Sequence, residues 1–488
     1  MAHRTPQQAQ ALERLHRHGR QQLAARPAAK TSVTGLGRFL VESEEQLIAL
    51  MNDTAPPTGG EVEFGMVLYW IHNDLPSDPF FRWLASLFPP TQITPEEVAR
   101  WEKIWQGPGV VAPDGTLVGY GTFEQLDKGW LYSTVLYLLT ILTSELPKAP
   151  FGTSPAEISV GSGSALRIAV IGDWGTGAWN DGGTQGPAAE IMQQIEALTP
   201  QPDLVIHVGD VYYSGTGDLP WVVSLAMTAL SAEIGVPFLS DEETVRLVNS
   251  WWCGGKAGNS FTLNSNHEMY SAARGYFHDG LEAAVFGAQK NTSYFALSFQ
   301  DWVILGLDSA YYSNSFAVME GRLQDADHTE QVQWVQSLDL QGKRVIVLTH
   351  HTGLTYDGQP ITSTEPTLWD DVKEALGGKG PDYWYWGHVH NGIVYTANAL
   401  GGTKARCLGH GALPFGNAYF WQNGQKHDLG QSPSVEYYAH TPKPNPHHNP
   451  RWDNRVLNGF ALLTLGPGTL TEAFYEQGNP RPVWTASS

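Results

Sequence analysis

Cysteine is scarce in this sequence of 488 residues, which contains only Cys253 and Cys407. Neither has a second cysteine at the spacing of a CxxC motif, so a framework of several disulfides is excluded. We expect two buried free thiols, with a single optional disulfide as the alternative.

Basic residues are also few: 29 Lys and Arg stand against 49 Asp and Glu, a formal net charge of −20. Such an acidic balance argues against general nucleic-acid binding and against docking on anionic lipid, because both need clustered Lys and Arg. An anionic substrate would therefore need a local source of positive charge, for which a metal ion is the obvious candidate.

Long apolar runs are missing too. The longest, Trp130–Leu142, has about 13 residues, whereas a membrane-spanning helix needs about 20. It predicts a buried helix, and no membrane span is expected. The N-terminus lacks the apolar stretch of a secretory signal, so we expect a cytoplasmic protein. With 42% hydrophobic residues the chain can still form a sizeable core.

The composition changes along the chain and predicts three parts. Residues 1–145 are expected to be mostly helical, with a clear helix after Thr94, where Pro95 and Glu97 suit a first helical turn. Their role is unknown, and they are a candidate for partner docking or homo-oligomer formation. Residues 146–165, rich in Pro, Gly and Ser, read as a linker. Residues 166–488 would then form a catalytic domain.

The third part begins with a predicted βαβ unit: a strand at Leu166–Ile171, a helix at Ala188–Leu198 and a strand at Leu204–Val208. Two later runs flank Gly466-Pro467-Gly468 and predict a hairpin, Phe460–Leu465 and Leu470–Tyr475. Further strands are expected at Ser293–Phe299, Trp302–Leu307, Arg344–Thr349 and Pro381–Trp386.

Metal-ligating residue types follow several of these strands. They are Asp173 in IGDWG, Asp210 in VGDVYY, Asn266-His267-Glu268 in NSNHE, His350-His351 in VLTHH, and His388 and His390 in WGHVH. In an open α/β sheet, ligands bind at the carboxyl ends of strands, so these side chains should converge. Aspartate, imidazole and amide oxygen suit zinc, manganese or iron, and a bridging carboxylate would make a two-metal site.

This ordered set of motifs resembles that of the calcineurin-like metallophosphoesterase superfamily. The resemblance covers roughly residues 166–475. It implies an α/β (α+β) fold in which two mixed sheets form a four-layer β-sandwich flanked by helices, and two bound metal ions.

Two details resemble the purple acid phosphatase branch. The histidine often found two residues after the first Asp is missing, because Trp174-Gly175 follows Asp173, and Tyr213 lies three residues after Asp210. A tyrosine at this spacing implies a phenolate ligand to Fe(3+), paired with Fe(2+), Zn(2+) or Mn(2+). A packed aromatic beside Tyr212 is the alternative reading of Tyr213.

Carried over, the resemblance places Asp173, Asp210, Tyr213 and His390 on one metal, and Asp210, Asn266, His350 and His388 on the other, with Asp210 bridging. His267 would contact the phosphate and protonate the leaving oxygen. His350 is favoured over His351 as the ligand; His351 would then lie behind it or face the substrate. His410 either approaches the pocket or is a structural turn residue. Ser265 replaces the usual Gly before Asn266.

The expected function is therefore a dinuclear metal-dependent hydrolase of phosphate esters, in which a metal-bound hydroxide attacks phosphorus and His267 assists the leaving group. The substrate would be a small-molecule phosphoester. Two alternatives remain: a phosphodiesterase for nucleotides or lipids rather than a phosphomonoesterase, and a binding or scaffold protein that retains its metals.

Overall fold

A computed structural model describes residues 110–111, 117–118, 122–123, 129–142 and 146–488, apart from 181–184, 222, 225–226, 229–230, 232–236, 414–418, 423–424 and 444–455. The helix expected after Thr94, like most of the helical region predicted for residues 1–145, lies outside the described residues. The expected helix Trp130–Leu142 is present with these bounds as α6.

One sheet has six strands in the order β18-β17-β16-β4-β5-β6. The strands are β4 (Leu166–Ile171), β5 (Leu204–His207), β6 (Ser260–Thr262), β16 (Gly459–Gly466), β17 (Thr469–Glu476) and β18 (Trp484–Ser487). β4, β5 and β6 are parallel, and the other three run antiparallel to their neighbours. The predicted βαβ unit and the predicted hairpin both belong to this sheet.

The second sheet has eight strands in the order β15-β11-β12-β10-β9-β8-β7-β3. They are β3 (Ala156–Ser159), β7 (Phe295–Phe299), β8 (Trp302–Gly306), β9 (Arg344–Thr349), β10 (Tyr383–Trp386), β11 (Gly392–Tyr395), β12 (Lys404–Leu408) and β15 (Val435–Tyr438). β8, β9, β10 and β12 are parallel to one another, so their carboxyl ends lie at one edge of the sheet.

The remaining described elements are short or lie outside the two sheets. Two small hairpins pair β1 (Val110–Val111) with β2 (Leu117–Val118) and β13 (Tyr419–Gln422) with β14 (Gln425–Asp428). The α-helices besides α6 are α7 (Pro187–Ala197), α9 (Asn266–Met269), α10 (Glu330–Ser337) and α11 (Leu368–Ala375). Turns of 3-10 or π helix run over Glu243–Leu247, Val248–Ser250, Tyr276–Gly280, Ala284–Gln289, Phe316–Val318 and Leu429–Gln431.

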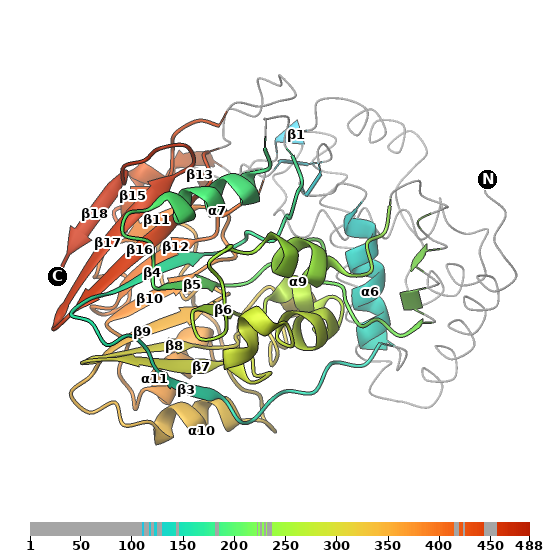
Figure 1. The fold of residues 1–488 in the computed structure, drawn as a ribbon, viewed down its shortest axis with the longest axis horizontal. Coiled ribbons are helices and arrows are strands. Elements are labelled where there is room, and N and C mark those ends of the chain that lie inside the picture. Colours follow the sequence, from blue (N-terminus) through green and yellow to red (C-terminus); the bar gives the residue numbers. More distant parts are fainter. Residues whose placement is uncertain are drawn as a thin grey trace, which may run out of the picture.

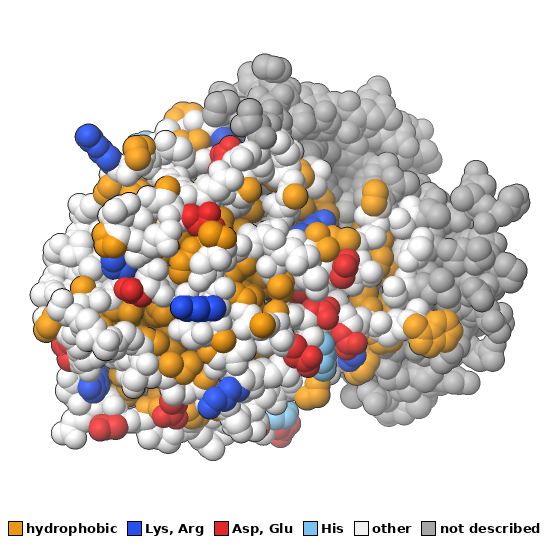
Figure 2. Space-filling model, viewed as in Figure 1, with side chains coloured by type: hydrophobic (Ala, Val, Ile, Leu, Met, Phe, Trp, Pro, Cys, Tyr) orange, Lys and Arg blue, Asp and Glu red, His pale blue; other side chains and the backbone are white. Residues whose placement is uncertain are grey.

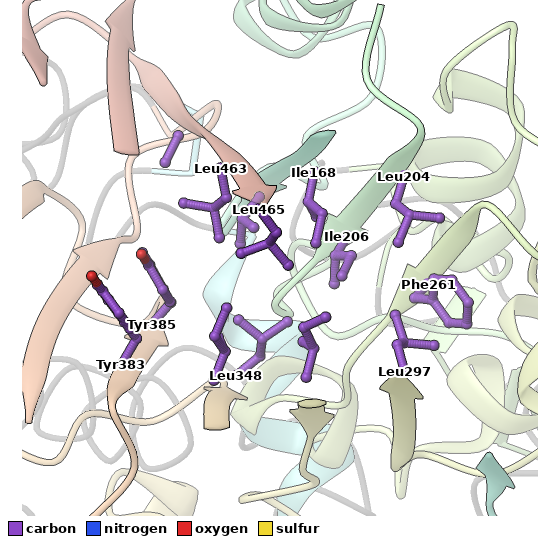
Figure 3. Close-up of a cluster of buried hydrophobic side chains, with 14 of the residues drawn as sticks. Ile168, Leu204, Ile206, Phe261, Leu297, Leu348, Tyr383, Tyr385, Leu463 and Leu465 are labelled. Carbon is purple, nitrogen blue, oxygen red and sulfur yellow. The ribbon is translucent and has the colours of Figure 1, made fainter. Parts of the chain in front are cut away.

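The two sheets face each other across the main core, with helices on their outer faces (Figure 1). Between the sheets, Ile168, Ile206 and Phe261 of one meet Leu297 and Leu348 of the other (Figure 3). α7 covers the outer face of the six-stranded sheet, and α10 and α11 cover that of the eight-stranded sheet. The prediction of two mixed sheets in a four-layer sandwich is confirmed.

A buried ion pair also joins the sheets. Arg406 on β12 donates two hydrogen bonds to Glu472 on β17, from Nε to Oε1 at 2.7 Å and from Nη2 to Oε2 at 2.9 Å. Tyr385 on β10 donates to the same Oε1 at 2.7 Å. Because the side chains of Arg406 and Glu472 are only 4% and 2% exposed, each needs the other to compensate its lost hydration.

The segment predicted as a linker, 146–165, contains strand β3, which pairs in parallel with β7 at the edge of the eight-stranded sheet. Ala149 also donates its backbone N–H to the carbonyl oxygen of Ala272 at 2.9 Å. This segment is therefore part of the folded body rather than a free connection. The division of the chain into three domains stays a prediction.

Only 16% of the residues are charged. On the visible face of the described residues, acidic and basic side chains accordingly lie in small scattered groups (Figure 2). Both cysteines are free thiols, but only Cys407 is buried, whereas Cys253 is exposed, contrary to expectation. Within the described residues, every helix is too short or too polar to cross a bilayer.

Candidate metal centre

The predicted ligands converge at the carboxyl ends of parallel strands from both sheets. Asp173, Asp210 and Asn266 follow β4, β5 and β6 of the six-stranded sheet, while His350 and the pair His388 and His390 follow β9 and β10 of the eight-stranded sheet. Their loops meet because the sheets face each other with these strand ends on the same side. The site therefore lies where the two sheets join.

Asp173, Asp210 and His350 form the centre of this cluster, with one ligating atom from each lying within 4.8 Å of the others. His350 Nε2 is 3.2 Å from Asp210 Oδ1, and His350 Nδ1 donates to the Val208 carbonyl oxygen at 3.0 Å. A carbonyl oxygen only accepts, so the proton of neutral His350 sits on Nδ1. Nε2 then presents its lone pair to the site, as a metal ligand requires.

The other three predicted ligands surround this group. Asn266 Oδ1 lies 2.8 Å from His350 Nε2, and His388 Nδ1 lies 3.2 Å from the same atom. His390 Nε2 lies 3.3 Å from Asp173 Oδ1. The structure thus brings together six of the seven residues predicted as metal ligands.

The carboxylates of Asp173 and Asp210 are buried and strongly perturbed. Burial and the neighbouring Asp210 raise the pKa of Asp173 well above its usual value. Burial alone would raise the pKa of Asp210 as well, but His267 and His350 hold it well below its usual value. A cation between the two carboxyl groups would favour ionisation of both, which is the form that ligates metal.

The imidazoles are held in the neutral form. Burial lowers the pKa of His350 and of His390 to about 3, and it lowers the pKa of His388 as well. Neutral imidazole is the state that binds a metal ion. Two buried carboxylates, three neutral imidazoles and one amide oxygen form a donor set that suits zinc, manganese or iron, so the residues fit a two-metal centre.

Glycines in the motifs allow these groups to approach closely. Gly209, before Asp210, has φ of 105°, a conformation that side chains rarely tolerate, and a Cβ there would lie 2.7 Å from His350 Nδ1. The ligands Asp173, Asp210 and His388 themselves adopt positive φ values of 55°, 80° and 64°. Such backbone costs about 1–3 kcal/mol per residue and is typical of functional sites.

The tyrosine at this cluster is Tyr212, not Tyr213 as predicted. The Tyr212 hydroxyl lies 2.8 Å from Asp210 Oδ2, 3.3 Å from Asp173 Oδ1 and 3.3 Å from His390 Nε2. Tyr213 points elsewhere, since its hydroxyl accepts a hydrogen bond from the Phe123 backbone N–H at 3.1 Å.

The backbone around these tyrosines is fixed by two residues that the motif pattern did not reveal. Glu242 accepts from the N–H groups of Tyr213 at 2.7 Å and Ser214 at 2.8 Å, while Arg246 donates to the Tyr212 carbonyl oxygen. Glu242 and Arg246 also form an ion pair at 3.1 Å. No motif flags them, because they act through backbone atoms some 30 residues away in sequence.

His267 lies beside the cluster in the orientation expected of a proton donor. Its Nδ1 lies 2.7 Å from the Tyr213 carbonyl oxygen, and its Nε2 lies 3.7 Å from Asp210 Oδ2. Because the carbonyl can only accept, Nδ1 carries a hydrogen, and Nε2 is the nitrogen that faces the site. Ser265 caps α9 by accepting from the His267 N–H at 3.0 Å, so the serine that stands in place of the usual glycine has a structural role.

The two histidines of uncertain role are both buried. His351 lies within ligating distance of His350 and His388, but its Nδ1 is 2.9 Å from Ser309 Oγ and its Nε2 is 2.7 Å from the Val318 carbonyl oxygen. Both ring nitrogens of His351 bond groups outside the predicted ligand set, whereas Nε2 of His350 faces Asp210 and Asn266, which favours His350 as the ligand. His410 is 2% exposed and packs against Gly392 and Gly459, with burial lowering its pKa to about 3.

Fold and site together define the class of protein: a metallophosphoesterase domain with a buried Asp and His metal-binding cluster. Residues 166–392 match the family described as calcineurin-like phosphoesterase, so this segment is a calcineurin-like phosphoesterase domain. The superfamily resemblance of the sequence is confirmed at this level. No curated protein matches the chain in sequence.

Several solved structures share the general arrangement at low identity. GAP50, the anchor in the inner membrane complex of Plasmodium, is 13% identical over 66% of this chain and 88% of that chain, with a TM-score of 0.39. PhoD is 11% identical over 68% and 70%, with a TM-score of 0.38. Vps29 from Cryptosporidium parvum is 12% identical over 67% and 98%, with a TM-score of 0.25. At these values none of the likenesses bears on function.

Proposed function

We propose that the protein is a metal-dependent hydrolase of phosphate esters. The observation that carries this proposal is the convergence of three predicted ligands from each sheet, with Nε2 of His267 facing Asp210, the carboxylate at the centre of the set. Phosphoryl transfer needs a concentrated positive charge and an acid for the leaving oxygen, and these residues provide for both.

The chain's own residues have distinct tasks in this reaction. The buried carboxylates and neutral imidazoles hold the metal ions, and bound metal ions supply Lewis acidity that activates water and stabilises charge on the phosphoryl oxygens. His267 in its protonated form donates from Nε2 to the leaving oxygen. The hydrogen bond from Nδ1 to the Tyr213 carbonyl keeps the ring in that orientation.

The metals and the branch of the superfamily belong to the same proposal. A phenol hydroxyl among Asp173, Asp210 and His390 supports Fe(3+) at that position, as in purple acid phosphatases, with Fe(2+), Zn(2+) or Mn(2+) as its partner. This hydroxyl belongs to Tyr212, two residues after Asp210, whereas the resemblance implied Tyr213, three residues after Asp210. Burial and the two carboxylates raise the pKa of Tyr212 well above its usual value, so a strongly charged cation is needed to ionise it.

The test combines metal analysis with substrate turnover. Purified protein loaded with iron, zinc or manganese is assayed with nitrophenyl phosphate and bis-nitrophenyl phosphate, and compared with an Asn266→Ala variant. We expect metal-dependent hydrolysis that the variant loses. Faster turnover of the diester would assign a phosphodiesterase, and faster turnover of the monoester a phosphomonoesterase. Metal binding without hydrolysis of any phosphoester would instead support the scaffold alternative.

A further inference from the structure

Helix α6 precedes the residues that match the phosphoesterase family, yet it packs directly beside the metal centre. It lies next to α9, the short helix that carries Asn266 and His267 (Figure 1). Val135, Leu136, Leu138 and Leu139 in its middle are at most 1% exposed. The middle of the helix is thus buried.

The first turn of α6 contacts the surroundings of His267. The Trp130 ring lies edge-on to the His267 ring, with centroids 4.9 Å apart. Ser133 Oγ donates to the Tyr213 carbonyl oxygen at 3.3 Å, the same atom that accepts from His267 Nδ1. This end of the helix therefore supports the acceptor that orients His267.

Tyr137, near the middle of α6, reaches Asn266 through one residue. Its ring packs edge-on against Tyr270, with centroids 5.7 Å apart, and the Tyr270 hydroxyl accepts from Asn266 Nδ2 at 3.0 Å. That hydrogen bond restrains the Asn266 amide. With Nδ2 bound to Tyr270, Oδ1 is left facing His350 Nε2, which is the orientation that a metal ligand requires.

The Tyr137 hydroxyl is also linked to two histidines, through the backbone of one turn. It accepts from the Ala317 backbone N–H at 3.0 Å, in a turn where Ala317 and Val318 have φ of 52° and 56°. Left-handed backbone is unfavourable for such residues by about 1–2 kcal/mol each, so the turn depends on contacts that hold it. The next two carbonyl oxygens, of Val318 and Met319, bond the imidazoles of His351 and His388.

We propose that α6 is a positioning element of the metal centre and that Tyr137 is its main positioning residue. The Tyr137 ring fixes Tyr270 and hence Asn266, while its hydroxyl fixes the 316–319 turn and hence His351 and His388. Neither the phosphoesterase motifs nor the matched segment includes this helix. The proposal rests on the proposed metal centre, and it makes α6 part of the support of that site.

The experiment measures metal affinity rather than turnover, using Zn(2+) or Mn(2+) titrated into metal-stripped full-length protein by calorimetry. Tyr137→Phe keeps the ring and loses the hydroxyl, and we expect metal affinity to fall by about 10–100-fold, as is usual for residues that orient ligands. Tyr132→Phe is the matched control, since Tyr132 lies on the same helix but packs against Phe238 instead. Its affinity should stay within about twofold of the wild type at a similar thermal midpoint.

Tyr270→Phe is a second variant. It removes the hydroxyl that accepts from Asn266 Nδ2 but leaves the sequence of α6 unchanged. We expect a loss of affinity of similar size. Unchanged affinity in Tyr137→Phe, or equal losses in Tyr137→Phe and Tyr132→Phe, would overturn Tyr137 as the main positioning residue of α6 while leaving the proposed hydrolase intact. If the wild type binds metal, the variants show the expected affinity losses and no phosphoester is turned over, the positioning role of α6 is supported and the proposed hydrolase is overturned.

Discussion

The Tyr212 hydroxyl lies 2.8 Å from Asp210 Oδ2, so a phenol belongs to the carboxylate cluster although its neighbour Tyr213 has the spacing that the motif predicted. Tyr213 contributes to the same region through its backbone. Its carbonyl oxygen accepts from His267, and its backbone N–H donates to Glu242. The two adjacent tyrosines thus serve different parts of the site, one through its side chain and the other through its backbone.

The first prediction uses the visible absorption of the iron-loaded protein to determine whether Tyr212 or Tyr213 binds the metal. Protein loaded with ferric iron should show a visible tyrosinate-to-iron charge-transfer band. Tyr212→Phe should abolish the band, because it removes the phenol near Asp173 and Asp210, whereas Tyr213→Phe should retain it. Absorption spectra of the three proteins at equal iron content make the comparison. Loss of the band in Tyr213→Phe alone would restore the original assignment, and a colourless, fully active zinc or manganese protein would remove the iron site.

The second prediction concerns His267 as the acid for the leaving group. His267→Asn should lower kcat by about 10²–10⁴-fold on an alkyl phosphoester, whose leaving oxygen needs a proton. The loss on a nitrophenyl ester should be much smaller, because nitrophenolate leaves without one. Metal content is measured alongside as the control. Equal losses on both substrates would show that His267 acts otherwise than by protonating the leaving group.

The third prediction tests the ion pair between the sheets. Arg406→Met leaves Glu472 buried without its charged partner and should lower the free energy of unfolding by about 3–5 kcal/mol. The double variant Arg406→Met, Glu472→Leu removes both charges, so it should recover much of that loss. Denaturant unfolding followed by circular dichroism gives both values. Equal destabilisation by the single and double variants would mean that packing, rather than the unpaired charge, dominates.

The fourth prediction is a pH dependence of stability. Burial, together with Glu268, Asp279 and Glu242, raises the pKa of Glu243 well above its usual value, and neither carboxylate oxygen of Glu243 has a hydrogen-bond partner among the described residues. The unfolded chain therefore releases this proton at lower pH than the folded chain. Stability consequently falls as pH rises from the ordinary pKa to the folded-state pKa, by at most about 1.4 kcal/mol per pH unit.

Glu243→Gln has no proton to release, so its stability relative to wild type should improve as pH increases above about 5. Thermal unfolding of both proteins between pH 5 and pH 8 checks this. A difference that stays constant over the range would mean that Glu243 is already ionised in the folded protein and is neutralised by a bound cation.

Strands that read as continuous apolar runs were predictable from sequence. β4 and β9 have the expected bounds, because runs such as Arg344–Thr349 are buried on both faces and end at a polar motif. β3 was missed because only Ala156 of its four residues is buried, so no apolar run marks it. Its strand character comes from pairing with β7, more than 130 residues later, and local sequence cannot show that.

The site shows the same division. The convergence of six predicted ligands could be foreseen because each stands at a strand end within a recognisable motif. The choice between Tyr212 and Tyr213 was not, because it depends on which way each side chain leaves the loop after Val211. The roles of Ser133, Tyr137 and Glu242 were also hidden, since their contacts are made to distant backbone atoms and leave no spacing pattern.

The predicted ligands come in equal numbers from the two sheets, and this has a consequence for the assembly of the proposed centre. No half of the cluster can hold a metal as the whole does, so the centre exists only after the sheets have docked. A bound ion would then link the two sheets at one end of the sandwich. Metal binding would therefore stabilise the docked sheets, and metal affinity would report how well the two halves of the sandwich are aligned at this end.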